Sequence, residues 1–148
     1  MNIICRTMTA LAALSFAACA ASNDVRNDAA PQLEGTSWQL VRFQGGDDAT
    51  LTPDDPKKYT IQFGADGQLT ARIDCNRGRG TWKSSAPNQL ELGPLALTRA
   101  MCPPGSLHDQ IVKQWGYVRS YVFKDGHLFL ALMADGGTYE FEPVTGAT

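Results

Sequence analysis

The segment "KYTIQFGADGQLTARIDC", residues 58–75, alternates apolar and polar side chains on both sides of the glycine-rich turn "GADG". Successive side chains of a β-strand point to opposite faces, so a period of two brings the apolar ones together. These apolar residues are Tyr59, Ile61, Phe63, Leu69, Ala71, Ile73 and Cys75. The segment therefore predicts an antiparallel hairpin with one buried face, and it directs Cys75 toward the core.

Further strand signals lie on both sides of this hairpin. Residues 35–43 and 138–144 are rich in aromatic and β-branched side chains, and shorter apolar pieces between them are separated by Gly, Pro and Asn clusters. We count about eight short strands and find no internal repeat. The pattern predicts a mainly β fold: a small antiparallel barrel or a strongly curved sheet, with one helix packed across it.

One helix signal follows the structure-breaking sequence "CPPG", residues 102–105. Four apolar residues then recur at helical spacing, and we expect Ser106 to be the N-cap. The residues of this stripe are Leu107, Ile111, Trp115 and Val118.

The N-terminus has the layout of a bacterial signal peptide. Residues 1–18 carry one arginine and then an apolar stretch of small residues, and "SFAAC" places Cys19 where a lipoprotein is acylated after cleavage. We expect Cys19 to be lipidated and residues 19–32 to form a flexible tether. The alternative is ordinary cleavage near the same point, because "ACA" also fits a general signal peptidase.

Cysteine usage points to one disulfide. Cys5 leaves with the signal peptide and Cys19 becomes the mature N-terminus, which leaves Cys75 and Cys102 in an oxidising compartment. A disulfide between them is the main expectation. Two alternatives stay open: a nucleophilic thiol, or a zinc site that also uses His108 and His127, although these spacings match no recurrent ligand pattern.

Several motifs occur in a characteristic order and resemble a known family. A Leu-x-Gly-x-x-Trp entry strand, a Cys-Asn followed by Gly, and a Thr-x-x-x-Cys before the helix are similar to the META domain found in HslJ-like, heat-inducible lipoproteins. The matching residues are Leu33, Gly35, Trp38, Cys75, Asn76, Gly80, Thr98 and Cys102. The resemblance implies a META domain over residues 33–144, with a tail at 145–148, and a lipocalin-like barrel in which these residues are structural. It implies no reaction.

The sequence offers one candidate contact for a partner. "NRGRG", residues 76–80, reads as a tight, irregular connection between strands, and Arg77 and Arg79 could hold an anion there. Arg99 would lie close by if the two cysteines are bridged. The alternative is a solvated turn. A loop with Asp47, Asp48, Asp54 and Asp55 lacks the spacing of a calcium site, so we expect it to be solvated.

These observations limit the functions that the sequence supports. A net charge of −2 does not suggest nucleic-acid binding, and no catalytic constellation or cofactor motif is visible. We expect a monomeric, non-enzymatic lipoprotein of the cell envelope, anchored in the outer membrane and facing the periplasm, that binds or maintains an envelope component, with a link to stress. A soluble periplasmic or secreted protein is the alternative location. The alternative functions are a carrier of a small apolar ligand and an inhibitor of an enzyme such as lysozyme.

Overall fold

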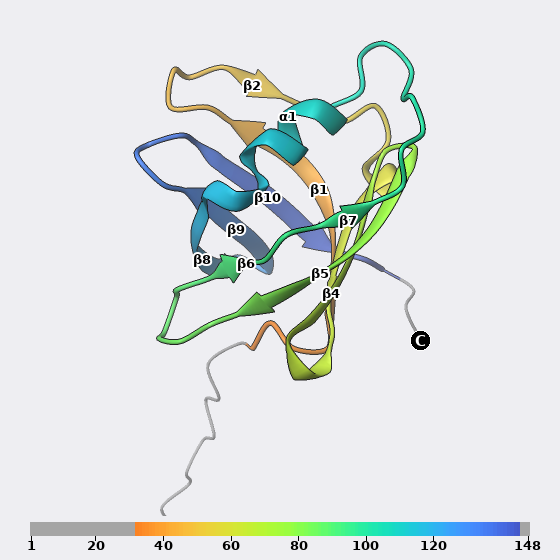
Figure 1. Cartoon of the computed structure of the whole chain (residues 1–148). Helices are drawn as coiled ribbons and strands as arrows, with labels where there is room; N and C mark the ends of the chain where they lie inside the picture. The colour runs from red at the N-terminus through yellow and green to blue at the C-terminus, as the bar shows by residue number, and fades with distance from the viewer. Residues whose placement is uncertain (1–31, 146–148) are drawn as a thin grey trace, which may run out of the picture.

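The structure is a computed structural model and describes residues 32–145. The predicted signal peptide, the acylation at Cys19 and all but the last residue of the predicted tether lie outside the described residues. Within them the chain forms ten strands, one α-helix and three short 3₁₀ segments (Figure 1). The strands are β1 (Thr36–Gln44), β2 (Thr50–Leu51), β3 (Tyr59–Phe63), β4 (Gln68–Ile73), β5 (Asn76–Lys83), β6 (Glu91–Leu92), β7 (Ala96–Leu97), β8 (Val118–Lys124), β9 (His127–Leu132) and β10 (Thr138–Pro143). The helix α1 spans His108–Gln114, and the 3₁₀ segments are η1 (Pro56–Lys58), η2 (Ala65–Gly67) and η3 (Trp115–Tyr117).

The strands form one antiparallel sheet that curves into a nearly closed barrel. Its order is β6-β5-β4-β3-β1-β10-β9-β8, while β2 pairs with β1 and β7 pairs with β5. The two ends of this path meet, because Leu90 N–H donates to the Arg119 carbonyl and Tyr121 N–H donates to the Asn88 carbonyl. The predicted mainly β barrel of about eight strands with one helix is therefore confirmed.

The hairpin predicted for residues 58–75 is formed by β3 and β4. Tyr59 lies opposite Ile73 and Phe63 lies opposite Leu69, and the three residues between them on each strand are paired in continuous register. All the predicted inward residues of this hairpin except Cys75 are buried. The turn contains Asp66 and Gly67 at positive φ, which explains why polar and glycine residues occur there.

One end of the barrel is covered by α1 and η3 (Figure 1). Trp115 is buried, and its indole N–H donates to the Gly93 carbonyl at 3.0 Å. Leu107 and Ile111 pack against the same core. The helix begins one residue later than expected: Leu107 occupies the N-cap position, while the Ser106 hydroxyl accepts a hydrogen bond from His108 N–H.

The barrel interior is filled by side chains. A void of about 30 Å³ lies among core residues that include Leu40, Ile61, Leu130 and Phe141. This volume is on the order of one water molecule.

The segment "NRGRG" is regular strand, so its interpretation as an irregular connection is wrong. β4 ends at Ile73, and only Asp74 and Cys75 form the turn, with Asp74 at φ 55°. The glycines are present because other groups approach closely. A Cβ on Gly78 would lie 2.7 Å from Leu97 Cδ2, and a Cβ on Gly80 would lie 2.9 Å from the Pro94 carbonyl oxygen.

Candidate functional site

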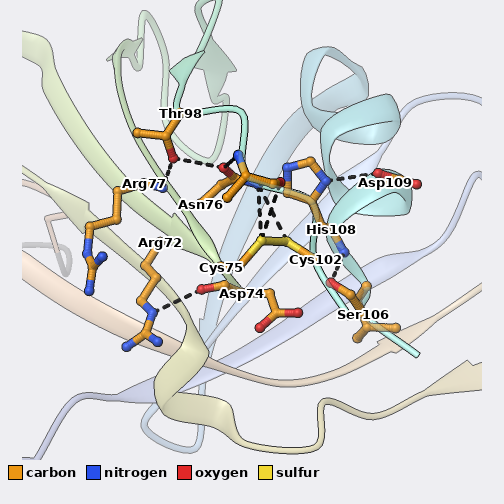
Figure 2. The surroundings of a disulfide bond; sticks show 12 residues. Arg72, Asp74, Cys75, Asn76, Arg77, Thr98, Cys102, Ser106, His108 and Asp109 are labelled. Atoms are coloured by element: carbon orange, nitrogen blue, oxygen red, sulfur yellow. Dashed lines mark hydrogen bonds and ion pairs between the residues drawn. A yellow bond between two sulfur atoms is a disulfide. The ribbon is translucent and has the colours of Figure 1, made fainter. Parts of the chain in front are cut away.

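A disulfide joins the β4–β5 turn to the segment that leads into α1. Cys75 and Cys102 are bonded, with their Cα atoms 5.4 Å apart, which confirms the predicted pairing (Figure 2). The bond takes up both thiols, so the structure supports neither the nucleophile nor the zinc-ligand interpretation of these cysteines. Cys75 lies in the turn and is half-buried rather than at the end of a buried strand face.

Asn76 holds the same two segments together through its side chain. It is 0% exposed, and its amide group donates to the Ala100 carbonyl at 2.9 Å. Its carbonyl oxygen accepts from the Thr98 hydroxyl and from Ala100 N–H, both at 2.8 Å, and the Thr98 hydroxyl also accepts from Arg77 N–H (Figure 2). A buried amide is costly unless it is hydrogen-bonded, and this one is. We call Cys75, Asn76, Thr98, Ala100 and Cys102 the stapled corner.

The entry motif is also structural. Leu33 and Trp38 are buried, and the Trp38 indole donates to the Thr36 hydroxyl at 2.7 Å. Gly35 adopts φ 77°, a conformation that glycine accommodates without strain, and its N–H donates to the Phe63 carbonyl. These contacts set the start of β1 against β3.

A large, open hollow lies on the outer face of the sheet. It is an open groove of about 850 Å³ that crosses β1, β3, β4, β5 and β7. No acidic and no aromatic side chain lines it. The lining residues are Ser37, Thr60, Ile61, Gln62, Thr70, Ala71, Arg72, Arg77, Gly78, Arg79, Ala96, Leu97, Thr98 and Val144. We call this the arginine groove.

Two of its arginines face each other across neighbouring strands. Arg72 on β4 lies directly opposite Arg77 on β5, and Arg79 lies opposite Thr70. Figure 2 shows Arg72 and Arg77 extending to the same side, away from the disulfide. Arg72 Nε donates to the Asp74 carbonyl at 3.1 Å, which positions its guanidinium. No ion pair among residues 32–145 involves any of the three arginines.

Other cross-strand charges in this sheet are complementary. Arg42 on β1 pairs with Glu140 on β10 at 2.7 Å, and Lys83 on β5 pairs with Glu91 on β6 at 3.0 Å. Like charges directly opposite each other destabilise a sheet, whereas opposite charges stabilise it. The arginine groove therefore departs from the charge pairing found elsewhere in the same sheet.

The sequence predicted only some of the residues that line this groove. Arg77 and Arg79, which the sequence suggested as a possible anion contact, both line the groove. They lie on a strand face rather than on a turn. Arg99 is exposed and is not among the lining residues. Arg72 was not proposed as a contact. Its outward position could be read from the alternation, but its place opposite Arg77 depends on the two-residue turn, which the sequence analysis did not predict.

The remaining titratable candidates do not gather into one site. His108 Nδ1 lies 2.9 Å from Asp109 on α1, and His127 Nδ1 lies 2.8 Å from Glu140 on the sheet. Within the described part of the chain, no three His, Cys, Asp or Glu side chains are placed to hold a metal.

The aspartate-rich loop makes local contacts. The Asp55 carboxylate accepts from Lys57 N–H at the start of η1, and Lys58 forms a hydrogen bond with Asp54 that lowers the pKa of the Asp54 carboxyl. Across residues 32–145, no helix is long and apolar enough to cross a membrane.

The fold and the stapled corner define a small disulfide-linked β-barrel domain with one capping helix. The META domain pattern matches residues 31–145, and the chain therefore belongs to the META domain family.

Two solved structures share the fold. A protein from Burkholderia xenovorans, determined by NMR, is 20% identical, with a TM-score of 0.64 over 76% of this chain and 84% of that chain. A DUF4847-family protein from Bacteroides vulgatus is 18% identical, with a TM-score of 0.53 over 73% of this chain and 92% of that chain. No curated protein matches the chain.

Proposed function

We propose that this META-domain protein is a non-enzymatic binding protein of the bacterial cell envelope. In this proposal Cys19 carries a lipid anchor in the outer membrane, and the domain faces the periplasm, where it binds an anionic envelope component in the arginine groove. The observation that carries the proposal is the groove itself, in which three arginines meet without a carboxylate. The disulfide supports the location, because such bonds persist in oxidising compartments.

The chemistry of the groove suits binding rather than catalysis. A guanidinium remains protonated in proteins, so it donates hydrogen bonds to an anion but does not exchange a proton during a reaction. The other polar groups of the lining are hydroxyls and one carboxamide, with no histidine or carboxylate beside them. General acid–base catalysis would need such a group within hydrogen-bonding reach.

The shape of the molecule counts against the two alternative functions. A carrier of an apolar ligand would need interior space, and the interior void is about 30 Å³. An inhibitor of a cleft enzyme such as lysozyme would need a protruding surface that enters the cleft. The arginines instead lie on the outer face of the sheet, on the regular strands β4 and β5.

Photo-crosslinking in intact cells tests the proposed site. A photoreactive amino acid replaces Thr70, which lines the groove, and in a matched control it replaces Val122, which is exposed on β8. The proposal predicts that the Thr70 position captures one envelope component that mass spectrometry identifies and that Val122 does not capture. Identical products from both positions, or none from Thr70, would contradict it.

The anchor has its own test. Cys19→Ser removes the acylated sulfur, and we expect the protein to move from the membrane fraction to the soluble periplasmic fraction. Unchanged membrane fractionation of the Cys19→Ser protein would refute the lipid anchor. This result would not affect the proposal that the arginine groove is a binding site, because the groove lies in the folded domain.

A further inference from the structure

We infer that the ligand of the arginine groove is an acidic saccharide chain that lies across the strands, its anionic groups bound by Arg72, Arg77 and Arg79. This inference rests on the proposed function and names the chemical class of the ligand. It follows from three properties of the groove: the arrangement of its charges, the kind of polar groups between them, and its extent.

The charges form a small array rather than a single point. Arg72 and Arg77 are direct neighbours on adjacent strands, and Arg79 follows Arg77 by two residues on the same strand face. The spacing between neighbouring strands is about 4.8 Å, and two residues along a strand span about 6.8 Å. Such an array binds several anionic groups at short intervals along a ligand. Each guanidinium is a planar fork that matches a carboxylate, phosphate or sulfate group.

The remaining polar lining is rich in hydroxyl groups. Four side chains supply hydroxyl or carboxamide groups that both donate and accept hydrogen bonds, as sugar hydroxyls do. They are Ser37, Thr60, Gln62 and Thr70. These groups lie on β1, β3 and β4, beside the arginines of β4 and β5.

The extent of the groove fits a chain of several units. The lining crosses five neighbouring strands, in the order β7, β5, β4, β3, β1, which corresponds to about 19 Å at the usual strand spacing. The groove is open to solvent, so a polymer can lie across it without entering an enclosed cavity.

Two other anionic partners fit less well. Aromatic residues are common anchors where a peptide binds, and the groove, whose apolar lining is aliphatic, holds no aromatic residue. An anionic membrane surface presents a broad plane of headgroups, whereas the three arginines form a small array on two neighbouring strands. The saccharide is the partner that uses both the charges and the hydroxyl groups.

The test measures binding of defined probes to the full chain in neutral detergent. The acidic probe is a tetramer of galacturonic acid, and the matched neutral probe is maltotetraose. Hexaglutamate and phosphatidylglycerol vesicles represent the peptide and the membrane. The variants are Arg72→Gln/Arg77→Gln and a control that also removes two positive charges, Lys57→Gln/Lys124→Gln, whose residues are exposed outside the groove.

We expect the galacturonate tetramer to bind the wild-type and control proteins alike and to lose at least tenfold in affinity with the arginine variant. Maltotetraose, hexaglutamate and the vesicles should bind at least tenfold more weakly than the acidic tetramer. No binding of the tetramer, equal binding by the arginine variant, or stronger binding of any other probe would overturn the inference. If the Thr70 crosslink in cells persists in that case, the groove remains the site and only its ligand class is wrong.

Discussion

The two faces of strand β5 use their polar residues in opposite ways. On the inward face, the Asn76 carboxamide is buried and bonded to Thr98 and Ala100. One residue later, on the outward face, Arg77 lies opposite Arg72, and neither forms an ion pair with a described residue. A single strand thus carries a buried, hydrogen-bonded carboxamide on one face and, on the other, an arginine at the site where we propose that the ligand binds.

Removing the disulfide should have the largest effect on stability. The bridge closes a loop with a sequence separation of 27, and its loss in Cys75→Ala/Cys102→Ala should lower the free energy of unfolding by about 3–4 kcal/mol. Urea denaturation measures this difference, and a reductant should shift the wild-type midpoint but not that of the variant. An unchanged midpoint in the double variant would mean that the stapled corner does not depend on its bridge.

Asn76→Ala should have the next largest effect. It leaves the Ala100 N–H and carbonyl groups without their partner, and we expect a loss of about 2–3 kcal/mol with the disulfide intact. Thr98→Val removes only the hydroxyl of the same network and should cost about 1 kcal/mol. Chemical denaturation under oxidising conditions measures the free energy of unfolding of both variants and shows which one loses more. The account is wrong about Asn76 if the Asn76→Ala protein is as stable as the Thr98→Val protein.

One of the two glycines on the inward face of β5 can be tested separately. Gly80→Ala places a methyl group 2.9 Å from the Pro94 carbonyl oxygen, so the backbone has to shift and the protein should lose about 1–3 kcal/mol. Gly116→Ala is the matched control, because its added Cβ meets nothing within 4 Å. Thermal unfolding compares the two. Equal melting temperatures would argue against close packing as the reason for Gly80.

The arginines should show the smallest effect, with the opposite sign. Arg72→Gln/Arg77→Gln removes two like charges that face each other, and the variant should be as stable as the wild type or up to about 1 kcal/mol more stable. Added salt should stabilise the wild type more than the variant, since salt screens the repulsion. Denaturation at low and high ionic strength checks both statements. A clear loss of stability in the variant would assign the arginines to the scaffold.

The sequence predicted the parts of the fold that follow from local pattern. Alternation predicted the hairpin of residues 58–75, and the cysteine count predicted the bond between Cys75 and Cys102, both of which the structure contains. Glycine was the source of the main error. It marks either positive φ or close approach of another group, and only the fold shows that Gly78 and Gly80 serve the second purpose.

The candidate site was harder to predict than the fold, for a reason of register. Whether two side chains face each other across strands depends on the length of the turn between them, and a shift of one residue moves every side chain to the other face. The two-residue turn at Asp74 and Cys75 sets Arg72 opposite Arg77. Local periodicity gave the outward direction of Arg72 but not this pairing.

The most direct test of the account is the Thr70 photo-crosslink repeated in cells that carry Arg72→Gln/Arg77→Gln. The account predicts that the captured envelope component is lost in this variant, while the variant accumulates to the wild-type level because its fold is intact. It also predicts that the component is still captured in Lys57→Gln/Lys124→Gln. Capture at the wild-type level by the folded arginine variant would contradict the claim that the outward face of β5 is a binding surface.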